Sequence, residues 1–160
     1  MHLRIFSRWP RHASPLRPIA QFSAVPWHSV SANVGEKDSK DLRVLLVEDV
    51  EDTRLFMRLE LEQNGFIVFE ADNGQAAVDL SKRETFDVIL MDLTLPLMNG
   101  FEAAKLIRQN DHLKNVPMIA VTAHQETDFR SDAKASGFDA YVTKPIDIVW
   151  LRELINGLVT

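Results

Sequence analysis

Residues 86–100 read FDVILMDLTLPLMNG. The first part of this stretch, through Met91, is an apolar run of strand length, and the second part is a loop that contains Pro96 and closes with Gly100. An apolar run without polar alternation is typical of a strand that is covered on both faces. Open α/β sheets place their reactive groups at the carboxyl ends of such strands, so Asp92 is the first candidate for a functional residue.

Three more apolar runs end in polar side chains that can bind cations or phosphate. They are Glu48 and Asp49 after residues 44–47, Thr122 after residues 118–121, and Lys144 after residues 140–143. Three acids, a hydroxyl and an amine, each at the end of a strand, indicate a site that holds a divalent cation beside a phosphorylatable carboxylate.

The chain from residue 41 onward alternates between strand and helix patterns. We expect strands at about 43–47, 66–70, 86–91, 117–121 and 140–142, and helices at about 51–63, 74–83, 100–109, 125–136 and 147–159. Strict alternation predicts a doubly wound α/β fold with a parallel sheet. Five such units fit the flavodoxin-like order 2-1-3-4-5, in which the ends of strands one and three lie side by side. Glu48 and Asp49 would then lie next to Asp92.

The expected helices carry apolar stripes, which should face the sheet. The stripes are Leu55, Phe56 and Leu59; Ala76, Ala77 and Leu80; Ala103, Leu106 and Ile107; and Leu151, Leu154, Ile155 and Leu158. Asn64-Gly65 and Ser136-Gly137 are predicted helix stops. Trp150 fits a core position better than an exposed anchor.

Bulk composition excludes several classes of protein. The 160 residues suffice for one domain with a full core. The absence of cysteine excludes disulfides and cysteine-bound metals, and no apolar run approaches the roughly 18 residues of a membrane span. Residues 41–160 carry 12 basic and 21 acidic side chains, which argues against nucleic-acid binding by the folded part.

Residues 1–40 form a basic extension with six Lys and Arg side chains against two acids. Four prolines interrupt every candidate helix, so we expect this segment to be disordered or loosely held and residues 41–160 to form the domain. The segment also resembles an organelle transit peptide in its Arg and Ser content, although its prolines weaken that interpretation. A start of translation near residue 41 is a third interpretation.

Three neighbouring carboxylates repel one another unless a cation neutralises them. Oxygen-only ligands favour a hard ion, so we expect Mg²⁺, with Mn²⁺ as a substitute. The direct ligands would be Asp49 and Asp92. Glu48 would be a water-mediated or optional ligand, and the backbone carbonyl of Thr94 a further one.

The expected nucleophile is Asp92, which would take a phosphoryl group to give an aspartyl phosphate. The metal and Lys144 would neutralise charge on the transferred group, and the hydroxyl of Thr122 would donate to it as a switch. Each residue alone has an ordinary alternative, such as a surface acid, a solvated lysine or a helix cap at Thr122. Their joint placement at strand ends argues against coincidence.

Residues 41–160 closely resemble the receiver (response regulator) domain of two-component systems, of the CheY-like superfamily. The motifs that carry the resemblance are Val47-Glu48-Asp49, the stretch 91–100, Val121-Thr122-Ala123 and Thr143-Lys144-Pro145. Their separations also match the family, with 43 residues from Asp49 to Asp92, 30 from Asp92 to Thr122, and 22 from Thr122 to Lys144.

The resemblance implies a role for each residue of the motifs. Asp92 would be the phosphoacceptor, Lys144 the phosphate-binding lysine and Thr122 the switch hydroxyl. Tyr141 would be an aromatic switch that turns inward with Thr122, against the alternative of a half-buried strand aromatic. The Lys144–Pro145 peptide bond would be cis.

Three further positions are expected to tune the lifetime of the phosphorylated state. Thr94 and His124 lie two residues beyond the phosphoacceptor and the switch hydroxyl, where the family's side chains face the phosphoryl group. Ala123 is small, which leaves that group accessible. The alternative for Thr94 and His124 is two exposed loop side chains without kinetic effect.

The resemblance also implies the partners. A histidine kinase or a histidine phosphotransfer protein would donate the phosphoryl group and dock beside the first helix. The fourth helix, fifth strand and fifth helix would form the face for a downstream protein, unless the phosphoryl group is relayed onward. We expect no separate output domain after the fifth helix, so the output would be protein–protein contact, a relay step or something done by the N-terminal tail. We also expect a cytoplasmic signalling protein, monomeric or weakly dimeric. Apart from self-phosphorylation and autodephosphorylation, it would not be an enzyme.

Two other functions compete with this interpretation. A phosphatase of the haloacid-dehalogenase type also uses an aspartyl phosphate, but it needs a second Asp two residues after the nucleophile, where this chain has Thr94. An interaction module that is never phosphorylated is disfavoured because all the phosphorylation residues are present.

Overall fold

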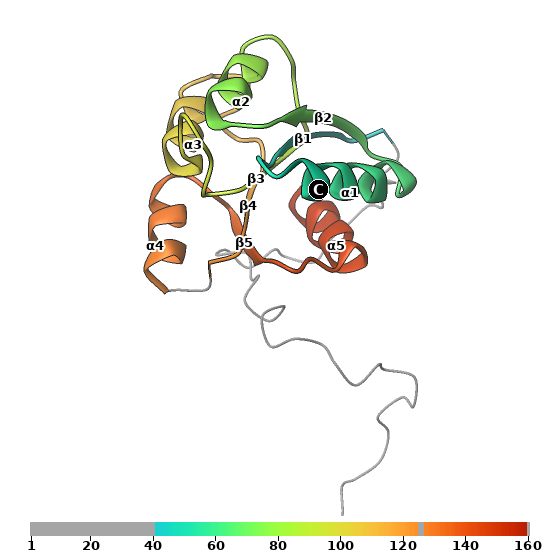
Figure 1. Cartoon of the computed structure of the whole chain (residues 1–160). Coiled ribbons are helices and arrows are strands. Elements are labelled where there is room, and N and C mark those ends of the chain that lie inside the picture. The colour runs from blue at the N-terminus through green and yellow to red at the C-terminus, as the bar shows by residue number, and fades with distance from the viewer. Residues whose placement is uncertain (1–40, 125–126, 160) are drawn as a thin grey trace, which may run out of the picture.

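The computed structural model describes residues 41–124 and 127–159, so the predicted extension at 1–40 lies outside the described residues. In this part, five strands alternate with five helices (Figure 1). The strands are β1 (Arg43–Val47), β2 (Ile67–Ala71), β3 (Val88–Met91), β4 (Met118–Thr122) and β5 (Ala140–Thr143). The helices are α1 (Glu51–Gln63), α2 (Gly74–Ser81), α3 (Gly100–Arg108), α4 (Thr127–Ala135) and α5 (Ile148–Val159). These bounds agree with the sequence-based expectation to within two residues, and residues 125–126 of the predicted fourth helix lie outside the described part.

The sheet has the order β2-β1-β3-β4-β5, and every neighbouring pair is parallel, which confirms the predicted doubly wound, flavodoxin-like topology. Val47 at the end of β1 pairs with Met91 at the end of β3. The residues that follow these two strands therefore leave the sheet at the same edge. This register brings the acids after β1 close to Asp92.

The sheet separates two apolar cores. Successive side chains of a strand point to opposite faces, and in β1 Leu45 packs into one core while Leu46 packs into the other. Helices α2, α3 and α4 cover the first face, and α1 and α5 cover the second (Figure 1). A sheet covered on both faces explains why β3 and β4 are fully buried apolar runs.

Local signals set the ends of several helices. The side chains of Asn73 and Asn99 accept hydrogen bonds from backbone N–H groups in the first turns of α2 and α3. Gly65 and Gly137 follow α1 and α4 with φ angles of 90° and 99°, a left-handed conformation that suits glycine. Both predicted helix stops are therefore confirmed.

The predicted core stripe of α1 is wrong. Leu55, Phe56 and Leu59 are 43%, 58% and 44% exposed, whereas Met57 and Leu61 face the sheet. Residues four apart lie on the same face of a helix. Leu55 and Leu59 therefore form one apolar stripe, and Met57 and Leu61 form a second stripe on the opposite side. Pattern alone does not say which stripe meets the sheet.

One smaller expectation about a helix face also needs correction. Leu106 of the α3 stripe is 40% exposed, although Ala103 and Ile107 are buried as predicted. Trp150 is partly buried and packs against the second core, in line with the preference for a core position over an exposed anchor. None of the helices in the described part of the chain has both the length and the apolar character needed to cross a bilayer.

Candidate functional site

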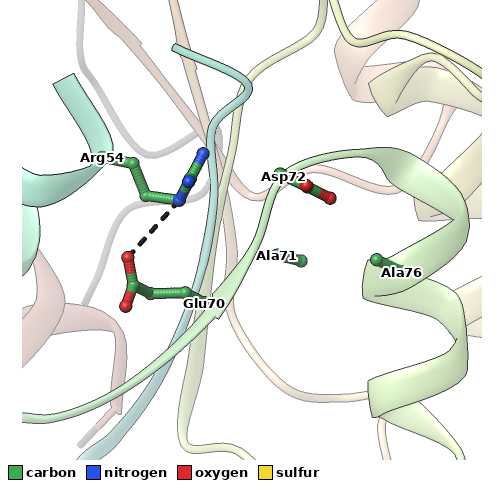
Figure 2. A pocket seen from close by; sticks show the side chains of 5 residues that line it. All are labelled: Arg54, Glu70, Ala71, Asp72 and Ala76. Carbon is green, nitrogen blue, oxygen red and sulfur yellow. Dashed lines mark ion pairs between the residues drawn. The ribbon is translucent and has the colours of Figure 1, made fainter. Parts of the chain in front are cut away.

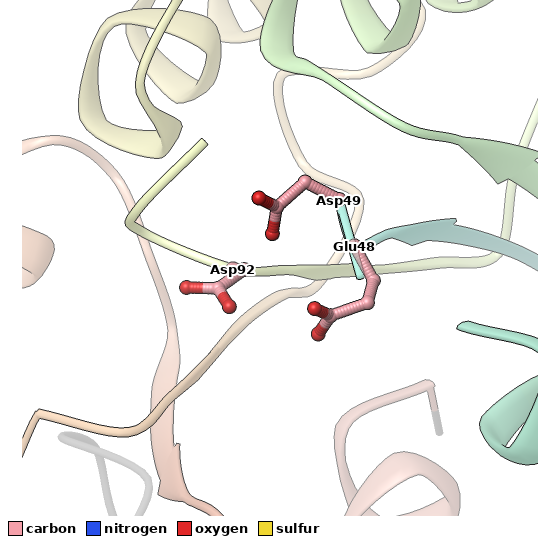
Figure 3. A group of neighbouring side chains, drawn as sticks. All are labelled: Glu48, Asp49 and Asp92. Atoms are coloured by element: carbon pink, nitrogen blue, oxygen red, sulfur yellow. The ribbon is translucent and has the colours of Figure 1, made fainter. Parts of the chain in front are cut away.

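Three carboxylates converge at the carboxyl edge of the sheet. Glu48 and Asp49 directly follow β1, and Asp92 directly follows β3 (Figure 3). One oxygen from each of the three lies within 4.8 Å of the others. Glu48 and Asp92 are buried, whereas Asp49 is exposed. The fold therefore gathers the three acids that the sequence predicted as one cluster.

Lys144, which follows β5, reaches into this cluster. Its Nζ donates to Oδ2 of Asp92 at 2.7 Å and to Oε2 of Glu48 at 2.5 Å. Burial acts to lower the pKa of Lys144, but the hydrogen bonds and negative charges of Asp92 and Glu48 outweigh it and raise the pKa above its ordinary value. The amine is therefore held as an ammonium ion against the Asp92 carboxylate.

The loop after β3 is folded closely around Asp92. The backbone N–H of Thr94 donates to Oδ1 of Asp92 at 2.9 Å, which leaves Oδ2 for Lys144. The N–H of Gly100 donates to the carbonyl of Leu93 at 2.9 Å, so α3 begins directly against this loop. A Cβ atom at position 100 would lie only 2.2 Å from the carbonyl oxygen of Asp92. The glycine is therefore required by a close backbone approach.

Thr122 ends β4 and is fully buried. Its Oγ1 accepts a hydrogen bond from the backbone N–H of His124 at 3.3 Å. Its carbonyl accepts from the backbone N–H of Lys144 at 2.9 Å. The hydroxyl and the ammonium thus belong to neighbouring backbone segments at the same edge of the sheet.

The ring of Tyr141 is 1% exposed and turned into the core beneath α4. Its hydroxyl donates to the carbonyl of His124 at 2.7 Å, and the guanidinium of Arg130 lies 5.3 Å from the ring centroid. The side chain is therefore more deeply buried than a half-exposed strand aromatic. It ties β5 to the loop between β4 and α4.

The remaining predicted residues lie around the same edge. Oγ1 of Thr94 lies 3.1 Å from Nε2 of His124, whose ring stacks on Phe129. Ala123 is exposed. The peptide bond between Lys144 and Pro145 is cis. The side chains singled out in the sequence thus come from the loops after β1, β3, β4 and β5, apart from Thr122 at the end of β4 and Tyr141 within β5.

The donor set of the cluster fits a hard divalent cation. Glu48, Asp49 and Asp92 offer carboxylate oxygens only, which is the chemistry that Mg²⁺ prefers. Lys144 offsets one of the three negative charges, so an excess of negative charge remains for a cation to neutralise.

Sequence reasoning missed Arg54, in the first turn of α1. Its Nη1 donates to the carbonyl of Glu48 at 2.8 Å, and its Nε lies 3.4 Å from Oε1 of Glu70 on β2 (Figure 2). The sequence did offer a signal, because Arg54 lies five residues after Asp49 in the first turn of the predicted helix. A long side chain at this position can reach back to the loop that carries the acids.

Comparisons with known proteins agree with this geometry. Residues 44–156 match the response regulator receiver domain. The chain is 35% identical over 114 residues to the polar-differentiation response regulator DivK of Brucella anthropi, which covers 71% of this chain and 93% of DivK. It is 32% identical over 113 residues to the CAI-1 autoinducer sensor kinase/phosphatase CqsS of Vibrio cholerae, but this match spans 70% of the chain and only 16% of CqsS.

A solved structure shows the same fold with an ion in place. The receiver domain of sensor histidine kinase PA1611 from Pseudomonas aeruginosa has a magnesium ion coordinated in its active-site cleft. It is 29% identical to this chain with a TM-score of 0.71, covering 74% of this chain and 98% of that domain. The fold, the acidic cluster and these matches together place the chain in the response regulator receiver domain family of two-component systems.

Proposed function

We propose that this receiver accepts a phosphoryl group from a phosphohistidine onto Asp92 with the help of Mg²⁺. The observation that carries the proposal is the contact of the Lys144 ammonium with Oδ2 of Asp92 inside a cluster of three carboxylates. An ammonium ion beside a reactive carboxylate is positioned to neutralise a phosphoryl group that arrives there. The coarser conclusion, that the chain is a receiver and hence typically a signalling protein, does not depend on this step.

The transfer exchanges one bond to phosphorus for another. A carboxylate oxygen of Asp92 attacks the phosphorus atom, the P–N bond of the phosphohistidine breaks, and its electron pair returns to the imidazole nitrogen, which takes up a proton. Lys144 holds the negative charge of the transferred group, and the Thr122 hydroxyl donates a hydrogen bond to it. Bound Mg²⁺, held by Asp49 and Asp92 with Glu48 as an outer ligand and the Thr94 carbonyl as a further one, would add charge neutralisation.

The output is a change at the face made by α4, β5 and α5. Movement of Thr122 toward the phosphoryl group would displace the adjoining loop, whose His124 carbonyl accepts the hydrogen bond of Tyr141. A buried aromatic side chain tied to that loop would carry the movement to α4 and β5. A protein partner bound at this face would then gain or lose affinity, unless the phosphoryl group is passed onward to a second histidine.

The donor would dock on the exposed stripe of α1. Leu55, Phe56 and Leu59 present apolar surface there. An apolar hollow of about 400 Å³ lies between α1 and the segment after β5, and its lining includes Phe56, Ile146 and Lys144 itself. A helical phosphodonor seated on this surface would bring its histidine to the lysine end of the acidic cluster.

A small-molecule phosphodonor tests the proposal without a partner. The full chain is incubated with phosphoramidate and Mg²⁺, and phosphorylation is followed by a mobility shift on a phosphate-affinity gel. We expect a shift that hydroxylamine reverses, that Asp92→Asn abolishes and that Asp72→Asn retains, because Asp72 follows β2 at the same edge but lies outside the cluster. Labelling that persists in Asp92→Asn would contradict the proposal. The phosphatase alternative has no support in the family match.

A further inference from the structure

Arg54 is the one side chain from α1 that hydrogen bonds to the loop carrying Glu48 and Asp49, within the described residues. Its Nη1 donates to the carbonyl oxygen of Glu48 at 2.8 Å and lies 3.5 Å from the carbonyl oxygen of Asp49. The side chain is only 18% exposed, so these contacts are made close to the body of the domain.

The guanidinium is also fixed from the opposite side. Its Nε lies 3.4 Å from Oε1 of Glu70, which projects from β2 (Figure 2). The other oxygen of Glu70 lies 3.3 Å from Nη1 of Arg58, one turn further along α1. A planar guanidinium can serve two partners at once in a fixed geometry, so Arg54 ties the loop after β1 to the neighbouring strand β2.

The loop after β1 must direct two consecutive side chains, Glu48 and Asp49, to the same cluster. Consecutive residues of a strand point to opposite faces, yet Glu48 and Asp49 both present an oxygen to one cluster. The chain must therefore turn immediately after β1, and the carbonyl groups of Glu48 and Asp49 at this turn both lie near the guanidinium of Arg54. The side chain of Glu48 supports the turn from inside by accepting from the N–H of Val50 at 3.3 Å. Arg54 supports it from outside.

We propose that Arg54 is a positioning residue that holds the exposed carboxylate of Asp49 ready for the cation. It does not touch the metal or the phosphoryl group. Its contacts with the carbonyls of Glu48 and Asp49 fix the backbone on either side of the Asp49 Cα atom, so cation binding does not have to order this loop. Outer partners of this kind commonly alter metal affinity by one to two powers of ten. This role presupposes the Mg²⁺-assisted phosphoacceptor function proposed above.

The positive charge of Arg54 and its contacts with the loop predict opposite changes in cation affinity when the side chain is removed. Loss of a positive charge near the acidic cluster would strengthen cation binding. Loss of the loop support would weaken it. Arg58 provides a matched control, because it lies on the same helix, pairs with the same Glu70 and has no described hydrogen bond to the loop.

The experiment measures Mg²⁺ binding to the unphosphorylated full chain by titration calorimetry, with Mn²⁺ binding by electron paramagnetic resonance as a second readout. We expect Arg54→Met to bind about tenfold more weakly than wild type and Arg58→Met to stay within about twofold. Arg54→Lys keeps the positive charge but lacks the planar guanidinium that can bond to two partners at once, so we expect an intermediate affinity for the cation. Phosphorylation of Arg54→Met at saturating Mg²⁺ should approach the wild-type rate.

Several outcomes separate this role from the proposed function itself. Unchanged or tighter cation binding by Arg54→Met would overturn the role of Arg54 and leave the phosphoacceptor function standing. Equal weakening in Arg58→Met would also overturn it. Absence of cation binding by the wild-type chain would instead overturn the proposed function. If Arg54→Met does not fold, as circular dichroism would show, Arg54→Lys decides the question by the same measurement.

Discussion

Oγ1 of Thr94 and Nε2 of His124 lie 3.1 Å apart, although 30 residues separate them in the sequence. This contact joins the loop after β3, which begins with Asp92, to the loop after β4. The ring of His124 also stacks on Phe129 of α4, with ring centroids 4.2 Å apart and planes 8° from parallel. The loop that carries Asp92 is thereby connected to α4 through one hydrogen bond and one aromatic stack.

The first prediction concerns the lifetime of the aspartyl phosphate. The double variant Thr94→Ala and His124→Ala should dephosphorylate faster than wild type, by about fivefold if the lost contact of about 1 kcal/mol shields the phosphoryl group from water. Decay of the phosphorylated band on a phosphate-affinity gel measures the rate. Thr85→Ala, which removes an exposed threonine hydroxyl elsewhere, should leave it unchanged. An unaltered decay in the double variant would show that the two side chains have no kinetic effect.

The second prediction compares two helical glycines. Gly100→Ala should lower the free energy of unfolding by about 1–3 kcal/mol, because the new Cβ atom meets the carbonyl oxygen of Asp92 at 2.2 Å. Displacement of this loop should also slow phosphorylation of Asp92. Gly157→Ala in α5 meets nothing within 4 Å and should stabilise the protein by about 0.5–1 kcal/mol. Urea denaturation measures both changes, and equal effects of the two substitutions would refute the close-contact explanation.

The third prediction concerns Leu97, whose φ angle is 65° and whose side chain is 88% exposed. A leucine in the left-handed region is strained, and asparagine adopts that conformation more readily. Leu97→Asn should therefore raise the free energy of unfolding by about 0.5–1 kcal/mol, measured by thermal or urea denaturation. Val149→Asn removes another exposed apolar side chain without a positive φ and should change stability by less than about 0.5 kcal/mol. A gain shared by both variants would mean that replacing an exposed apolar side chain by a polar one, and not relief of backbone strain, raises the stability.

Much of the fold was predictable because its signals are local and repeated. Each strand is a short apolar run, each helix has a polar face, and the alternation of the two allows few topologies. The order 2-1-3-4-5 then determines which strand ends meet, so the grouping of Glu48, Asp49 and Asp92 followed from topology. Lys144 reaches Asp92 for the same reason.

The errors and omissions arise where local sequence leaves two options open. In α1 the stripes through Leu55 and through Met57 are both apolar, and only the packed sheet selects the second. The contact of Arg54 with the Glu48 carbonyl depends on how the loop turns after β1, which no residue pattern specifies. Side-chain partnerships between loops, such as Thr94 with His124, also depend on the folded positions of both loops.

The last prediction concerns the alkaline stability of the cation-free protein. The pKa of Lys144 is raised above its ordinary value of 10.5, so the protonated amine is favoured by folding, and its contribution is complete below that value and lost as pH rises through the raised pKa. In EDTA at pH 8, Lys144→Gln should be less stable than wild type by about 1–3 kcal/mol. The difference should shrink above about pH 10.5, where the unfolded chain begins to lose the Lys144 proton that the folded protein still holds. Urea denaturation of wild type and Lys144→Gln at pH 8 and at pH 11.5 measures the difference in stability. A difference that stays constant to pH 11.5 would mean that Lys144 stabilises the fold by packing rather than by charge.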